Sequence, residues 1–189
     1  MTCFICGCLP LSSYGPMTTL SKSQVTALLK KEKKVEPKAK EPRLLEFYDP
    51  GHSINKLREM FPDFFHSKIG EGWYDNEDFA KEKDKPQMRK ISLDIVEGSL
   101  NKTFEEQKKM LPKGQEVPTA RVLISAILLH YLDSGEKTFE EHWAGTCTRT
   151  AHGNLVNVGG VARGLSVVYW GADAGPDAGV ASLWTSSEL

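Results

Sequence analysis

One cysteine and two histidines lie close together along the chain, where they could act as a nucleophile and its base. Cys147 stands five residues after His142 and five residues before His152. A cysteine nucleophile needs a base within hydrogen-bond reach and a third group that orients this base. The spacing permits such a set without requiring it, because a cysteine in a strand usually packs as a small apolar side chain. Cys147, His142 and His152 are therefore only weak catalytic candidates.

Three further cysteines, Cys3, Cys6 and Cys8, have the spacing C-x2-C-x-C. Thiolates at this spacing can share a zinc ion, which makes them weak metal candidates. A closed zinc site needs a fourth ligand, and no second C-x2-C or paired histidine follows in the sequence. We therefore expect no metal and no other cofactor. Residues 1–16 carry no charged side chain, and we interpret them as a candidate mis-assigned leader before Met17.

A basic arm precedes an acidic body. Residues 17–43 carry eight Lys or Arg and three Glu, a net charge of +5, whereas residues 44–189 sum to −6. We expect a basic helix followed by a flexible tether, because the run before Leu44 mixes Lys, Glu and Pro with few apolar residues. Lysines neutralise phosphates, so non-specific nucleic-acid binding is one alternative function. The residues that would carry it are Lys30, Lys31, Lys33, Lys34, Lys38, Lys40 and Arg43.

Aromatic residues are concentrated between residues 61 and 74. They include Phe64, Phe65, Trp73 and Tyr74, with acidic residues between them. Aromatic side chains of this kind usually pack in a core. If they are partly exposed, they form a surface suited to binding another protein.

The body reads as a single α+β domain over residues 44–189. Its strongest helix is expected at 118–134, with Pro118 in the first turn, Gly135 after the end and apolar residues almost all round, so it should be central and buried. Ser53 should cap a short helix, and both Thr103–Glu106 and Thr138–Glu141 match the capping box. Strands are predicted at 90–96, 146–150, 155–158, 165–170 and 180–184, most of them in an antiparallel C-terminal sheet.

The segments Trp73–Lys83 and Lys102–Gln107 resemble an uncharacterised bacterial protein family. No activity comes with this resemblance. It implies a cytoplasmic bacterial protein and assigns no functional residue.

Composition and motifs favour binding over catalysis. The chain has no apolar run long enough to cross a membrane, and its cysteine pattern does not match a secreted disulfide framework. We expect a soluble cytoplasmic module that binds an unknown partner, most simply another protein. The alternatives are nucleic-acid binding through residues 30–43 and a hydrolase-like enzyme with its site on the glycine-rich loops of the C-terminal sheet.

Overall fold

The computed structural model describes residues 42–161, 164–171 and 178–185. The predicted leader, basic helix and most of the tether lie outside these residues. The helices are α2 (Ile54–Met60), the 3-10 helix η1 (Pro62–Phe64), α3 (Asp78–Lys81), α4 (Phe104–Met110) and α5 (Ala120–Ser134). The strands are β1 (Leu44–Asp49), β2 (Gln87–Ser92), β3 (Gln115–Glu116), β4 (Trp143–Arg149), β5 (Leu155–Val161), β6 (Gly164–Trp170), β7 (Ala178–Val180) and β8 (Leu183–Trp184).

The strands form two four-stranded sheets, so the predicted α+β class is confirmed. The first sheet has the order β1-β2-β8-β3 and the second has the order β6-β5-β4-β7. All pairings between these strands are antiparallel except β4 with β7, which is parallel. The single strand predicted at 180–184 is in fact two short strands, one in each sheet, because the chain crosses between the sheets at Ala181 and Ser182.

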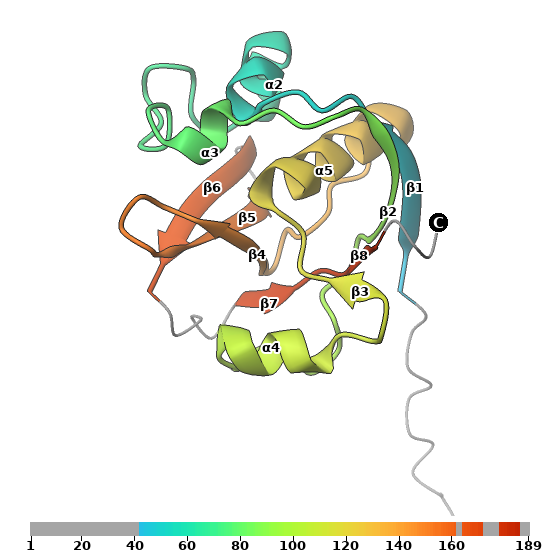
Figure 1. The fold of residues 1–189 in the computed structure, drawn as a ribbon. Helices are drawn as coiled ribbons and strands as arrows, with labels where there is room; N and C mark the ends of the chain where they lie inside the picture. The colour runs from blue at the N-terminus through green and yellow to red at the C-terminus, as the bar shows by residue number, and fades with distance from the viewer. Residues whose placement is uncertain (1–41, 162–163, 172–177, 186–189) are drawn as a thin grey trace, which may run out of the picture. The chain divides into compact units, whose positions relative to one another are not determined.

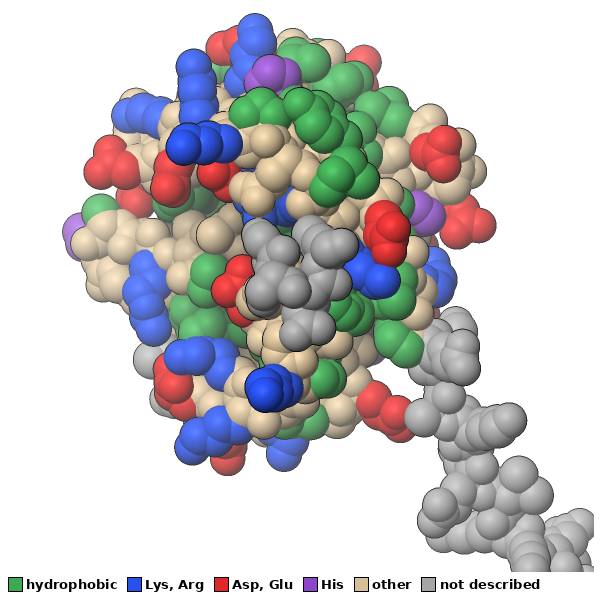
Figure 2. Space-filling model, turned by 45° about the vertical axis from the view of Figure 1, so that its right-hand side comes forward, with side chains coloured by type: hydrophobic (Ala, Val, Ile, Leu, Met, Phe, Trp, Pro, Cys, Tyr) green, Lys and Arg blue, Asp and Glu red, His purple; other side chains and the backbone are tan. Residues whose placement is uncertain are grey.

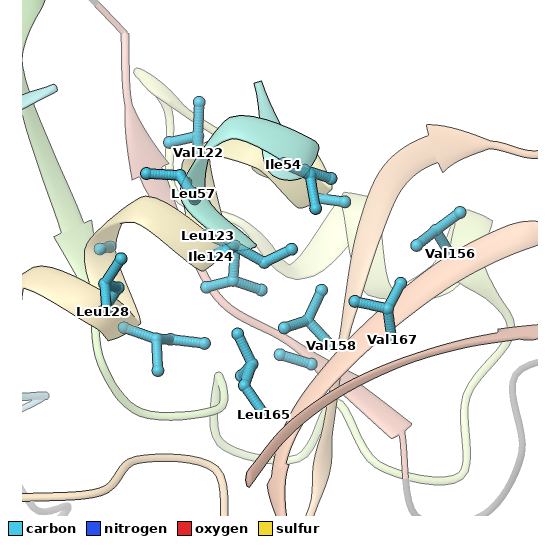
Figure 3. Packing of buried hydrophobic residues seen from close by; sticks show 14 of the residues in the cluster. Ile54, Leu57, Val122, Leu123, Ile124, Leu128, Val156, Val158, Leu165 and Val167 are labelled. Carbon is cyan, nitrogen blue, oxygen red and sulfur yellow. The ribbon is translucent and has the colours of Figure 1, made fainter. Parts of the chain in front are cut away.

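Helix α5 is the centre of the fold, as the sequence predicts. Its side chains from Ala120 to Leu128 are buried all round, and the helix lies between β1–β2 and β4–β6 (Figure 1). Thr119 caps its start by accepting a hydrogen bond from the Val122 N–H, and Gly135 ends it in the left-handed region at φ 73°. Figure 3 shows Leu123 and Ile124 of this helix packed between α2 and the β5–β6 side chains.

Local capping signals gave mixed results. Ser53 caps α2, and Thr103 and Glu106 form the complete predicted capping box at α4, whose hydrogen bonds from Thr103 lower the pKa of Glu106. The matching box at Thr138–Glu141 starts no helix, so that prediction is wrong. Phe139 is buried in the core at a positive φ of 55°, a backbone conformation that a helix cannot include.

The sequence predicted only part of the antiparallel pair β1–β2. β1 was not predicted at all, and β2 covers 87–92 rather than 90–96. In β1 both faces carry large apolar side chains: Phe47 is buried, whereas Leu44 and Tyr48 are exposed. The alternation that identifies a half-buried strand is therefore absent from its sequence.

Candidate functional site

Trp73 and Tyr169 form the most prominent exposed aromatic pair in the described residues. Trp73 lies in the loop 66–77 and is 40% exposed, and Tyr169 lies near the end of β6 and is 50% exposed. Their rings meet edge to face with centroids 4.8 Å apart. The Trp73 indole N–H donates a hydrogen bond of 2.9 Å to the Val167 carbonyl, which fixes the indole against the edge of β6.

The other aromatic residues of the predicted patch lie mostly beneath the surface. Tyr74 and Phe65 are buried in the core, and Phe64 is partly buried against Tyr131 at a centroid distance of 5.1 Å. Burial raises the pKa of the Tyr74 phenol to about 12, despite the opposing charge of Arg58. Of the four residues predicted as a protein-binding patch, Trp73 is therefore the one that offers a large exposed surface.

A buried arginine supports the loop from below. Arg58 of α2 is 1% exposed, and its guanidinium ion-pairs with Asp75. It also donates to the Ser67 carbonyl from Nε and Nη2 at 3.2 and 2.8 Å and to the Lys68 carbonyl. Its carbon Cζ lies 4.6 Å from the centre of the Tyr74 ring. The Arg58 side chain thus binds the loop that carries Trp73 both before this residue, at Ser67 and Lys68, and after it, at Asp75.

Asp75 completes this arrangement from within the loop. Its Oδ2 accepts hydrogen bonds from the backbone N–H groups of Gly70 and Gly72 at 2.8 and 3.0 Å. Buried charges are stable only when they are paired and hydrogen-bonded, and here the guanidinium and the carboxylate satisfy each other and the turning backbone. The loop 66–77 is irregular in secondary structure, and these contacts tie it to α2 and to itself.

The catalytic candidates do not assemble. Cys147 in β4 is exposed, yet the surrounding protein removes enough water from its thiol to raise its pKa, and the charge of Glu116 adds to this. No hydrogen bond joins it to His142 or His152 in the described residues: the Nδ1 of His142 is buried without a partner, and His152 lies exposed in the turn between β4 and β5. A raised pKa keeps the thiol protonated, which opposes nucleophilic reactivity.

The remaining predicted sites are largely outside the described ranges. Cys3, Cys6 and Cys8 lie there, and the residues that the structure describes contain no group of three His, Cys, Asp or Glu that could hold a metal. Of the seven basic residues predicted to bind nucleic acid, only Arg43 lies in the described ranges. Its Nε and Nη2 donate to Asp94 Oδ1 at 3.0 and 2.9 Å, so its guanidinium is already engaged by a carboxylate.

Comparison with protein-family models, curated proteins and solved structures finds no match to this chain. Among the helices of the described residues, none combines the length and apolar character needed to span a bilayer.

Sequence reasoning missed two residues of this site, Arg58 and Tyr169. A signal for Arg58 was present, because it lies four residues after Ile54 and next to Leu57 on the apolar face of α2. An arginine on such a face is buried only when acidic groups or carbonyl oxygens pair with its guanidinium. Tyr169 had no comparable signal, since its contact with Trp73 depends on the packing of the loop against the distant strand β6.

Proposed function

We propose that this chain is a cytoplasmic protein-interaction module and that Trp73 and Tyr169 form its contact surface. The observation that carries the proposal is the support of the loop 66–77 by the buried Arg58. Exposed loops that are held in one conformation by buried charged groups are suited to recognition, because little conformational entropy is lost on binding.

The residue types at the surface agree with this role. Tryptophan and tyrosine are enriched among the few residues that dominate the binding energy of protein interfaces. Here the two rings are in contact, and Tyr74 and Phe79 pack beneath Trp73 at centroid distances of 5.5 and 6.0 Å. A partner that covers the exposed ring faces would therefore contact an indole that other aromatic side chains hold in place.

The two alternatives have less support. A hydrolase-like site would need a thiolate beside a base, whereas Cys147 has a raised pKa and no histidine partner in the described residues. Nucleic-acid binding would depend on Lys30 to Lys40, which lie outside those residues, together with Arg43, which Asp94 already binds.

The test is comparative capture from a lysate of the source cells with immobilised full-length chain. Tyr169→Ala removes an exposed ring for which no hydrogen bond is described, so it should fold normally. Met60→Ala, which removes an exposed apolar side chain from α2, is the matched control. A partner should be retained by the unmodified chain and the control and lost with Tyr169→Ala.

Binding of the purified partner is then measured by calorimetry. We expect Tyr169→Ala to weaken it by at least about 1 kcal/mol, a loss that only a minority of interface residues cause when they are truncated. Equal affinity for Tyr169→Ala and Met60→Ala would refute this surface. Capture of nucleic acid in place of protein would support the alternative function.

A further inference from the structure

Strand β1 has an edge that is unpaired within the described residues. Among these residues it is the outermost strand of the first sheet and pairs only with β2. The Leu93 N–H donates to the Arg43 carbonyl at 2.8 Å, and hydrogen-bonded pairs alternate along antiparallel strands, so 45, 47 and 49 bond to β2. The N–H and C=O groups of Leu44, Glu46 and Tyr48 therefore point away from the sheet. No backbone partner for them exists in the described part of the chain.

The long edge strand of the second sheet is treated differently. On β6, the Leu165 carbonyl accepts from the His66 N–H and the Val167 carbonyl from the Trp73 indole, both at 2.9 Å. Exposed strand edges template pairing with other chains, and coverings of this kind prevent it. β1 has six residues and lacks such a covering in the described ranges.

The opposite edge of that second sheet is covered as well. On β7, the Ala178 carbonyl accepts from the Gln107 side chain, and the Val180 N–H donates to Ser99 Oγ at 3.2 Å. The remaining edge strand, β3, has only two residues. In the part of the chain that the structure describes, β1 is therefore the one long strand edge open for pairing.

Exposed apolar side chains flank this edge. Leu44 and Tyr48 lie on the outer face of β1, and Tyr48, 60% exposed, stands opposite the exposed Met88 of β2. Glu46 lies between them and pairs with Lys90 at 2.9 Å. Figure 2 brings the β1–β2 side of the molecule forward and shows hydrophobic side chains gathered in its upper part.

We infer that two copies of this chain pair antiparallel through their β1 edges and form a symmetric dimer. The order apolar, acidic, apolar at 44, 46 and 48 reads the same in both directions. With Glu46 opposite Glu46 of the second copy, each Leu44 stands opposite a Tyr48, and all the outward backbone groups of these residues find partners. The two Glu46 carboxylates repel each other across the axis, and the ion pair of each with Lys90 offsets this repulsion. Each Glu46 keeps its own Lys90. The first sheets of the two copies, each of order β1-β2-β8-β3, become one continuous sheet about a two-fold axis.

The inference is tested by sedimentation velocity of the full-length chain over a range of concentrations under reducing conditions, which excludes cysteine cross-links. We expect a monomer–dimer equilibrium. Tyr48→Lys places a charge opposite Leu44 twice per dimer and should raise the dissociation constant about tenfold or more. Met60→Lys makes the same kind of change on α2 and should leave the dissociation constant unchanged.

A mixing experiment tests the register. Leu44→Lys and Tyr48→Glu should each weaken self-association when alone. In a mixture, Lys at 44 faces Glu at 48 across one side while the native Leu44–Tyr48 pair remains on the other. The mixture should therefore dimerise more tightly than either variant alone.

Three outcomes would overturn the inference. These are a chain that stays monomeric throughout, a dimer that Tyr48→Lys does not weaken, and a mixture that associates no better than its components. A monomer whose edge is occupied by another protein or by residues before 42 falls under the first. This inference is independent of the proposed function: Tyr48→Lys should keep partner binding, and Tyr169→Ala should keep the dimer.

Discussion

Asp49 and Arg121 form a two-point ion pair inside the protein. Nη1 and Nη2 of Arg121 donate to Oδ1 and Oδ2 of Asp49 at 3.1 and 3.0 Å. Arg89 Nε donates to the same carboxylate at 2.9 Å, and both arginines also bind Asp84. Asp49 is fully buried. The network therefore joins β1, β2 and the first turn of α5, and its stability depends on every charge keeping a partner.

Replacing Asp49 by Asn should destabilise the fold by about 3 kcal/mol at neutral pH, because it leaves two arginines short of a buried partner. Burial alone would raise the pKa of Asp49, but the hydrogen bonds and charge of Arg121, together with the hydrogen bonds from the Gly51 N–H and Arg89, lower it below 3.8. The ionised carboxylate therefore stabilises the fold above the unfolded-state pKa, and this stabilisation is lost as the pH falls through the lower folded-state value.

Urea unfolding at a series of pH values measures this effect. The difference between the unmodified chain and Asp49→Asn should be largest above about pH 4 and should shrink below it. Glu59→Gln, which removes an exposed carboxylate paired with Lys56 on α2, is the control and should change stability by less than about 1 kcal/mol. A difference between Asp49→Asn and the native chain that stays constant down to pH 2 would contradict the assignment.

Replacing Arg58 by Met should release the loop 66–77. The change leaves the Asp75 carboxylate and the Ser67 and Lys68 carbonyls without their buried donor, so the loop amides should exchange hydrogen faster than in the native chain. Hydrogen exchange followed by mass spectrometry detects this in peptides covering the loop. Lys56→Met, on the exposed side of the same helix, should leave the loop protected. Unchanged protection with Arg58→Met would show that another contact fixes the loop.

Two leucines of α5 separate core packing from surface exposure. Leu128 is 1% exposed, and Leu128→Ala should cost about 2–5 kcal/mol of unfolding free energy. Leu132, one turn later, is largely exposed, and Leu132→Ala should stay within about 0.5 kcal/mol. Chemical denaturation of both variants gives the comparison. Similar losses in the two would place the helix face differently from the structure.

The central helix was predictable because its signals are local and agree with one another. Pro118 and Gly135 mark its ends, and its apolar residues exceed one face, which indicates a buried helix. The helix begins two residues later than predicted, because Thr119 is its cap and Pro118 precedes it. Thr138–Glu141 shows the limit of such signals. The residues that cap α4 start no helix there, because Phe139 is buried in the core with a positive φ. The packing that places Phe139 in this conformation comes from residues distant in the sequence.

The candidate site illustrates the same limit. Trp73 was identified from the cluster of aromatic residues in the sequence. Its exposed position, however, depends on Arg58 beneath the loop and on the hydrogen bond to Val167 of β6, far along the chain. The pairing of residues distant in sequence leaves no periodic trace in either segment. Burial of Tyr74 and Phe65 beside an exposed Trp73 is likewise decided by three-dimensional packing, because all of these side chains have similar apolar character.

Gly159 of β5 provides a final test of packing, because the ring of Trp143 lies directly against it. A Cβ atom at this position would stand 2.8 Å from the Trp143 ring, which itself packs on Trp170 at a centroid distance of 6.0 Å. The indole cannot move without disturbing that contact, so Gly159→Ala should destabilise the fold by about 1–3 kcal/mol and shift the tryptophan fluorescence. Gly171→Ala is the matched control, since a Cβ there meets nothing within 4 Å. Its melting temperature should equal or slightly exceed that of the native chain, because the substitution restricts the unfolded state. If both variants unfolded at the same temperature, Trp143 would have to be free to move away from the strand.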